Sequence, residues 1–313
     1  MQTALLRPSN ATRIRPLGNV SFGWISQLRW SPSGDMLAIA GGVGVAVYCG
    51  GFGGAADVHL RGHSAPVKDI AFNPDGQLLA SGSADTHIKL WTIAEQSPTE
   101  SATLAGHPDV VAALAWHPDG GSFASGGGDG TIRLWDAASG ELTSLLAGHS
   151  DEVTTLAFAA GGRWLFSGSR DGSIRRWDAR ANYASDIVGG HEGWLREIAP
   201  SPAGRLASAS KDGRIRLWEI DARFPKGVGK QPLRSWQAHG AGVDALAFSL
   251  DGALLVSGGR DNCLRFWEAE TGRELAARAE HQRPVLALAM HPAGGLLASG
   301  SGDNRVILWG ATL

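Results

Sequence analysis

The sequence predicts an all-β chain folded into a closed ring of four-stranded antiparallel sheets, and two observations predict it. First, the stretch LASGSADTHIKLW at residues 79–91 recurs five more times, as in FASGGGDGTIRLW at 123–135 and LASGSGDNRVILW at 297–309. Second, each unit of about 42 residues alternates short apolar segments with turn residues. One such sheet cannot bury its faces alone, so neighbouring sheets must stack. A ring completes the stacking and leaves only short, protected edges.

The unit that begins at His63 shows how each sheet is built. Its apolar segments are VKDIAF, LLASGS and IKLW, and the sequences NPDGQ and ADTH separate them. Asn, Pro, Asp and Gly are the residues that tight turns favour, and apolar blocks of four to six residues between them indicate strands rather than helices. The unit therefore contributes a series of short antiparallel strands.

Four residue types recur in near-fixed register in all six copies. A serine lies four residues before an aspartate, the aspartate lies six before a tryptophan, and a histidine lies 27 or 28 before that tryptophan. The histidines are His63, His107, His149, His191, His239 and His281; the serines are Ser81, Ser125, Ser167, Ser208, Ser257 and Ser299; the aspartates are Asp85, Asp129, Asp171, Asp212, Asp261 and Asp303; the tryptophans are Trp91, Trp135, Trp177, Trp218, Trp267 and Trp309.

Composition narrows the class of protein. The net charge of −2 gives no global reason to expect a nucleic acid or an anionic membrane as partner. The N-terminal residues lack the apolar stretch of a signal peptide, and no run of about 18 apolar residues predicts a membrane span. Cys49 and Cys263 show no metal or redox spacing, and two lone thiols fit a reducing compartment. We therefore expect a cytoplasmic protein.

The repeat resembles the WD-repeat (WD-40) β-propeller family. The resemblance rests on Gly-His and Trp-Asp pairs together with the serine–aspartate spacing. The pairs are Gly62-His63, Gly106-His107, Gly148-His149, Gly190-His191, Trp135-Asp136 and Trp177-Asp178, and the departures are Ala238-His239, Glu280-His281, Trp218-Glu219 and Trp267-Glu268. The resemblance implies that residues 1–313 form a single propeller domain, and we expect that ring to be a monomer.

A seventh, degenerate unit precedes the six regular ones, at about residues 21–49. Ser21 stands in the place of the histidine, Ile39 in that of the serine and Tyr48 near that of the tryptophan, while Val43 lies near the place of the missing aspartate. We therefore expect seven blades. By the resemblance, the segment Arg13-Ile14-Arg15 supplies the outer strand of the last blade and closes the ring.

The recurring Ser, His and Asp suggest a hydrolase triad, but nucleophilic catalysis needs only one exposed set. The resemblance instead implies a buried chain in every regular blade, from tryptophan through serine and histidine to aspartate. A metal site is not expected, because no CxxC or HExxH motif occurs. No cofactor is expected either, because neither the glycine-rich run at 41–54 nor GVGK at 227–230 has the spacing of a nucleotide-binding loop.

Function is expected on one face of the ring, which we call the upper face. By the resemblance, three positions per blade present side chains there: three and five residues after the histidine, and the residue before the aspartate. The candidate partner-binding residues at these positions are Trp24, Lys68, Glu152, Arg170, Trp194, Arg196, Lys211, Asp244 and Arg260. Five cations against two anions predict a basic arc, and tryptophan and arginine are enriched in binding hot spots.

The leading hypothesis is a non-catalytic scaffold that binds an acidic or phosphorylated segment of another protein on this arc, with Trp194 as apolar anchor. One alternative is an enzyme or small-molecule binder with a site in the central channel. Another is nucleic-acid binding through the arc, although four cations with few flanking aromatics give a small footprint. The segment Phe224–Lys230 is an insertion, because the interval between Trp218 and Trp267 is the longest between successive repeat tryptophans.

Overall fold

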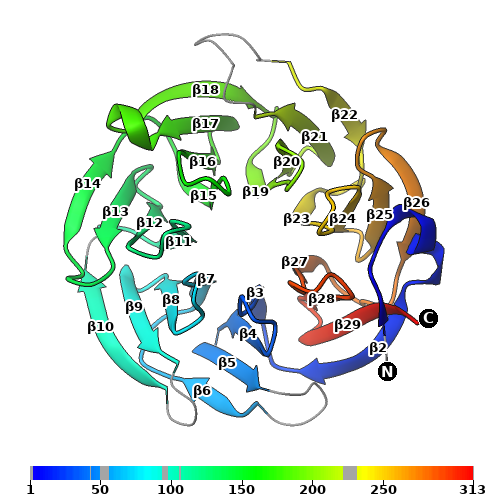
Figure 1. The fold of residues 1–313 in the computed structure, drawn as a ribbon, viewed down its shortest axis with the longest axis horizontal. Helices are drawn as coiled ribbons and strands as arrows, with labels where there is room; N and C mark the ends of the chain where they lie inside the picture. The colour runs from blue at the N-terminus through cyan, green and yellow to red at the C-terminus, as the bar shows by residue number, and fades with distance from the viewer. Residues whose placement is uncertain are drawn as a thin grey trace.

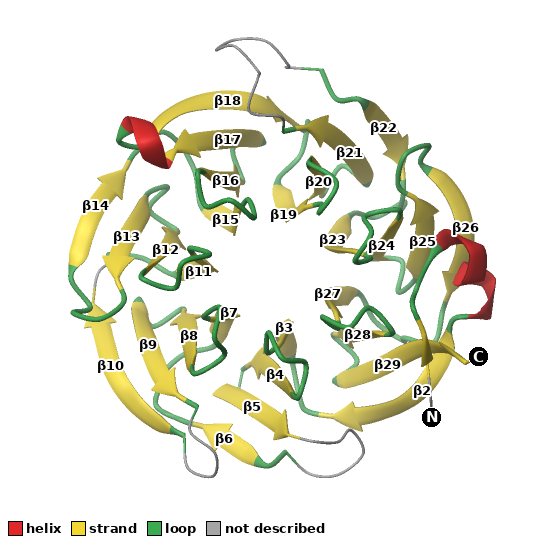
Figure 2. Cartoon of the chain, viewed as in Figure 1, coloured by secondary structure: helices red, strands yellow, loops and turns green. Residues whose placement is uncertain are grey.

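Seven antiparallel sheets stand around a central axis like the blades of a propeller; six have four strands, and the seventh has a short fifth strand (Figure 1). The structure, a computed structural model, describes residues 3–42, 44–49, 56–93, 98–105, 107–220 and 231–312. The expected all-β, seven-bladed ring is confirmed, and strands and loops account for nearly all of the cartoon (Figure 2). Val43, Gly106 and the Phe224–Lys230 insertion lie outside the described residues.

The first three blades follow the chain from the axis outward. Blade one is β3 (Ile25–Trp30), β4 (Met36–Gly41), β5 (Gly44–Cys49) and β6 (Val58–Leu60). Blade two is β7 (Val67–Phe72), β8 (Leu78–Ser83), β9 (His87–Thr92) and β10 (Thr99–Ala105). Blade three is β11 (Val111–Trp116), β12 (Ser122–Gly127), β13 (Ile132–Asp136) and β14 (Leu142–Leu146).

The next three blades repeat this order. Blade four is β15 (Val153–Phe158), β16 (Trp164–Ser169), β17 (Ser173–Asp178) and β18 (Ala184–Gly190), with the short 3-10 helix η2 (Ala179–Ala181) between the last two. Blade five is β19 (Leu195–Pro200), β20 (Arg205–Ser210), β21 (Arg214–Glu219) and β22 (Arg234–Gln237). Blade six is β23 (Val243–Phe248), β24 (Leu254–Gly259), β25 (Leu264–Glu268) and β26 (Arg273–Arg278).

Blade seven joins the two ends of the chain. Its inner strands are β27 (Val285–Met290), β28 (Leu296–Ser301) and β29 (Arg305–Thr312), and its outer strand is β2 (Arg15–Ser21). The short β1 (Thr3–Ala4) pairs with the last residues of β29, at Ala311 and Thr312. The N-terminal segment therefore closes the ring, as expected, by hydrogen bonds rather than by a covalent link.

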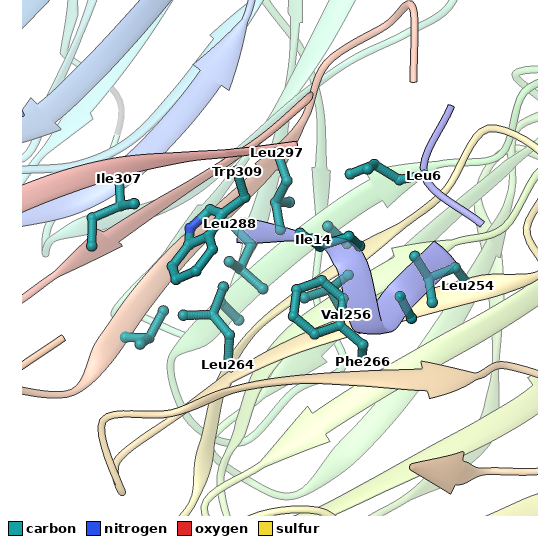
Figure 3. Packing of buried hydrophobic residues seen from close by; sticks show 14 of the residues in the cluster. Leu6, Ile14, Leu254, Val256, Leu264, Phe266, Leu288, Leu297, Ile307 and Trp309 are labelled. Atoms are coloured by element: carbon teal, nitrogen blue, oxygen red, sulfur yellow. The ribbon is translucent and has the colours of Figure 1, made fainter. Parts of the chain in front are cut away.

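The closing strand begins at Arg15, the last residue of the Arg13-Ile14-Arg15 segment predicted for it. Arg13 ends the 3-10 helix η1 (Pro8–Arg13), and Ile14 caps that helix before β2 starts. Ile14 is fully buried in the apolar cluster that also contains Phe266 of blade six and Trp309 of blade seven (Figure 3). Arg278 of β26 donates to the carbonyls of Thr12 and Ile14 at 2.9 Å. The segment thus ties blade six to blade seven before it becomes a strand.

Blade one has the apolar pattern of the other six blades but lacks their histidine, serine and aspartate. In β4 and β5, Tyr48 lies opposite Leu37, as Trp91 lies opposite Leu79 in blade two. Ile39 is fully buried at the position that serine takes elsewhere. The degenerate unit was predicted at about 21–49; β3, β4 and β5 fall within that range, and the outer strand β6 lies beyond it.

Candidate functional site

Each regular blade contains a hydrogen-bonded chain of tryptophan, serine, histidine and aspartate. The indole Nε1–H donates to the serine Oγ at 2.8–2.9 Å, the serine Oγ lies 2.6–2.8 Å from the histidine Nε2, and the histidine Nδ1 lies 2.7–3.4 Å from the aspartate. Each aspartate also accepts from a backbone N–H two residues on, within its own turn. Repetition of this chain in six blades indicates a packing role rather than catalysis.

Two arginines enter these chains, and the repeat pattern did not reveal them. Nη1 of Arg133 lies 2.6 Å from Nδ1 of His107 and donates to Asp129 at 2.8 Å. Arg265 takes the corresponding place beside His239 and Asp261, at 2.6 Å from each. Burial and, to a lesser extent, the charge of Arg133 lower the pKa of His107 to about 4, and Asp129 only partly opposes them. This histidine is therefore neutral at physiological pH.

The three predicted positions per blade form the upper face through a shared backbone contact. In all seven blades, the residue before the turn aspartate, or its blade-one counterpart Gly42, donates its N–H to the carbonyl of the residue three after the histidine, at 2.8–3.3 Å. Arg170 donates in this way to Glu152, and Lys211 to Trp194. The first and third positions of a blade are therefore immediate neighbours.

The remaining position is the second residue of each inner strand, and it surrounds the axis. All seven such residues line one cavity of about 570 Å³ at the upper end of the channel: Ser26, Lys68, Ala112, Thr154, Arg196, Asp244 and Leu286. The same cavity is lined by Trp24, Glu152, Arg170 and Arg260. Seven of the nine candidate residues thus meet around one space, while Trp194 and Lys211 lie outside its lining.

Three of the five predicted cations form ion pairs with carboxylates of the chain. Nη2 of Arg170 lies 2.8 Å from Oε2 of Glu152. The buried Asp244 lies between two arginines, with Arg196 Nε at 3.3 Å and Arg260 Nε at 3.0 Å. Within the described part of the chain, Lys68 and Lys211 have no carboxylate within 4 Å. The freely available positive charge is therefore smaller than the sequence suggested.

Trp194 is surrounded by cations. Its ring centre lies 4.3 Å from Nζ of Lys211 and 5.0 Å and 5.9 Å from the guanidinium carbons of Arg170 and Arg196. These distances fall within the range of cation–π attraction. The Trp194 side chain remains 39% exposed. The ring is thus held in place on the rim of the cavity with part of its surface open to solvent.

Trp24 belongs to a second hollow on the upper face, of about 700 Å³. Its lining includes Trp24, Arg260, Arg283 and Leu286. Trp24 is 52% exposed, and Arg260 lines this hollow as well as the central cavity. Arg283 is exposed and, among the described residues, has no carboxylate within ion-pair distance. The sequence reasoning missed Arg283 because it lies two residues after His281, outside the three positions considered.

Sequence reasoning also missed four charged residues that line the central cavity. Its lining includes Arg29, Asp69, Asp109 and Glu197, none of which occupies a predicted position. With these residues, carboxylates and cations are equal in number along the lining. The predicted excess of positive charge therefore does not apply to the cavity. Among the described residues of the three predicted positions and the second hollow, the cations without a carboxylate partner are Lys68 in the cavity lining, Lys211 beside Trp194 and Arg283 in the second hollow.

The repeat matches a known protein family. The profile of the WD domain, G-beta repeat family matches residues 57–92, 98–136, 140–178, 185–219, 230–268 and 272–310. The chain belongs to this family. WD-repeat propellers generally act as scaffolds for protein interactions. The matches begin at β6, so the profile leaves out most of blade one, where the histidine, serine and aspartate are absent.

Individual relatives resemble only part of this WD-repeat chain. It is 36% identical over 77 residues to the nuclear distribution protein nudF of Emericella nidulans, covering 25% of this chain and 16% of that protein. It is 32% identical over 85 residues to the small ribosomal subunit protein RACK1 of Caenorhabditis elegans, covering 26% of each. The matched part is about a quarter or less of these relatives. In the described residues, no helix is long and apolar enough to cross a membrane.

Proposed function

We propose that this WD-repeat propeller is a non-catalytic scaffold whose upper face binds an acidic or phosphorylated segment of another protein. One observation carries the proposal: exposed cations and exposed tryptophans lie together along blades five to seven and one. Lys211 and Trp194 are in contact at one end, and Arg283 and Trp24 line a common hollow at the other. Arg260 lies between them, at the border of both cavities.

Carboxylates and phosphates are the groups that such cations bind, and partly exposed indole rings supply apolar contact area. Arg196 and Arg260 are already held by Asp244, so they are positioned before a ligand arrives. A scaffold role is also consistent with the chains of tryptophan, serine, histidine and aspartate, because in every regular blade these side chains contact one another inside the blade. A cytoplasmic location and a monomeric ring remain predictions.

The test measures binding of short fluorescent peptides by polarisation. Four peptides of equal length are compared: Glu/Asp-rich, phosphoserine-containing, uncharged and Lys-rich, with a single-stranded oligonucleotide as a fifth probe. We expect the acidic or phosphorylated peptide to bind the wild-type protein at least tenfold more tightly than the uncharged and Lys-rich peptides. The double variant Lys211→Glu/Arg283→Glu should abolish that preference.

The matched control is Arg13→Glu/Arg234→Glu, which makes the same change of charge at exposed sites on the N-terminal segment and on the outer strand β22. The control should bind as the wild type does. Equal loss in both double variants would mean that only net charge matters, which contradicts the proposal. Preferential binding of the oligonucleotide would favour the nucleic-acid alternative.

A further inference from the structure

A second cavity opens below the first, and the two adjoin at Glu197. The lower cavity has a volume of about 460 Å³ and is lined by residues from all seven inner strands. Arg29, Leu156 and Glu197 line both cavities, so they form the waist of the channel. Glu197 is the third residue of β19 and belongs to none of the repeat positions.

Most of the side chains that line the lower cavity are apolar. Among the residues that line it, Arg29 and Glu197 are the only charged ones. The remainder are chiefly alanines and large apolar side chains such as Trp30, Phe72 and Met290. A ligand that enters from below therefore meets mostly apolar side chains first, and then a pair of opposite charges at the inner end.

The positive charge at the waist is already paired. Nη2 of Arg29 lies 3.6 Å from Oδ1 of Asp69. Asp69 also accepts from the backbone N–H of Ile70 at 2.9 Å and from that of Leu114, in the next blade, at 2.8 Å. Asp69 is thus held as the counter-ion of Arg29 by three contacts.

Glu197 has no comparable partner. Its carboxylate makes no hydrogen bond or ion pair within the described part of the chain. It interacts with the charges of Arg29 and Asp69 only at longer range. The neighbouring inner strands offer only uncharged groups at the third position, Thr155 on β15 and Ala245 on β23, and Thr155 Oγ1 already accepts from Ile198 N–H. Burial raises the pKa of Glu197 to about 7; Arg29 opposes this rise and Asp69 adds to it.

We propose that the lower cavity binds an alkylammonium group, with the ammonium at the Glu197 carboxylate and the aliphatic stem along the apolar wall. The group can belong to a lysine side chain of a partner or to a free aliphatic amine. An ammonium supplies the positive charge and the hydrogen-bond donors that this half-buried carboxylate lacks. An anion is disfavoured because the carboxylate would repel it. Entry from below is favoured because the lower lining, apart from Arg29 and Glu197 at the waist, carries no charged side chain.

The test compares pentylammonium with the neutral pentanol by NMR titration of the full-length protein. The wild type should bind pentylammonium at least tenfold more tightly than pentanol, with shifts at the indole of Trp30 and the methyl group of Met290. Glu197→Gln should lose that preference while still binding pentanol as before. The matched control Asp109→Asn removes the charge of a carboxylate of the upper cavity and should leave amine binding unchanged.

A pH titration and a variant that narrows the cavity complete the test. Between pH 5.5 and 7.5 the amine stays charged while Glu197 ionises, so its affinity should rise by about tenfold or more in the wild type and stay flat in Glu197→Gln. Ala157→Leu narrows the lower cavity alone and should weaken binding. Failure of the wild type to prefer pentylammonium, or equal amine binding by Glu197→Gln, would overturn the proposal.

Short peptides that carry lysine or Nε-acetyl-lysine distinguish the two sources of the ligand. Binding of the lysine peptide at least as tightly as pentylammonium identifies a protein side chain as the ligand. Binding of the free amine alone identifies a small molecule. Because Lys211→Glu/Arg283→Glu leaves the lower cavity intact, that variant should bind pentylammonium normally, and failure of the upper-face proposal would not affect this one.

Discussion

Nη1 of Arg133 lies 2.6 Å from Nδ1 of His107. A guanidinium only donates hydrogen bonds, so Nδ1 of His107 must accept and the ring proton must lie on Nε2. In blade seven, Ile307 takes the place of Arg133, and Nδ1 of His281 lies 3.0 Å from the Asp303 carboxylate. There the proton belongs on Nδ1. Copies of one repeat thus hold their histidines in opposite tautomers.

Nitrogen-15 NMR of the imidazole rings should therefore show the Nε2–H tautomer for His107 and the Nδ1–H tautomer for His281. Replacing Arg133 with leucine should convert His107 to the Nδ1–H form and raise its pKa, because a nearby positive charge is removed. If both rings have the same tautomer in the wild-type protein, the assignment is wrong.

Stability should fall as the pH is lowered from 6.5 toward 4. Burial lowers the pKa of His107 to about 4, and burial also lowers the pKa of His191, His239 and His281. In the unfolded chain these histidines bind protons near pH 6.5, whereas in the folded chain they bind protons only at lower pH. The stability present above pH 6.5 is therefore lost progressively below it. His107 alone should account for about 3 kcal/mol by pH 4.

The aspartates extend this loss to lower pH. Burial acts to raise the pKa of Asp171, but hydrogen bonds from His149 and Ser173 outweigh it and hold the pKa well below its usual range. Its stabilising effect is present above about pH 4 and is lost as the pH falls through the folded-state value. Thermal melts at constant ionic strength should show a falling Tm across both ranges; a constant Tm between pH 7 and 4.5 would contradict the histidine assignment.

The replacement Ser299→Ala should lower the free energy of unfolding by about 1–3 kcal/mol. Ser299 accepts from Trp309 Nε1 at 2.8 Å and lies 2.7 Å from His281 Nε2, so its loss leaves buried polar groups without a partner. Ser139→Ala, at an exposed turn, is the control and should change stability by less than about 0.5 kcal/mol. Urea denaturation of both variants measures the difference, and equal effects would argue against the chain as a stabilising element.

The replacement Thr86→Asn should stabilise the protein by about 1 kcal/mol. Thr86 follows the turn aspartate of blade two with a φ of 73°, in the left-handed region that β-branched residues disfavour. Asn262 and Asn304 occupy the same position in blades six and seven with a φ of 67°, so asparagine suits this turn. A rise in the urea midpoint relative to the wild type checks the prediction, and an unchanged or lower midpoint would show that the threonine is not strained.

The replacement Ile14→Ala should cost about 2–5 kcal/mol, because Ile14 is fully buried between blades six and seven. The loss should fall first on the ring closure, so hydrogen exchange should quicken in β2 and β29 more than in β11 and β12. Leu142→Ala, at an exposed position on β14, serves as the control. Uniform loss of protection around the ring would mean that the closure is not a separate weak point.

The sequence alone was sufficient for the repeated architecture. Strand and turn patterns, the spacing of His63, Ser81, Asp85 and Trp91, and the weaker match of Ile39 and Tyr48 all depend on local order along the chain. They predicted seven blades and a closure by the N-terminal segment, which the sheet pairings confirm. The exact start of the closing strand could not be predicted, because Ile14 is buried in a core that exists only when blades six and seven pack together.

Only the tertiary structure decided how the charges are used. Asp244 holds Arg196 and Arg260, and Arg29 is paired with Asp69, because inner strands from distant parts of the chain converge on one axis. The same convergence leaves Glu197 half-buried at the waist of the channel, with no hydrogen-bond or ion-pair partner among the residues that the structure describes. Repeats determine a fold through periodic, short-range patterns, whereas the net charge of a site depends on which unrepeated side chains meet across the ring.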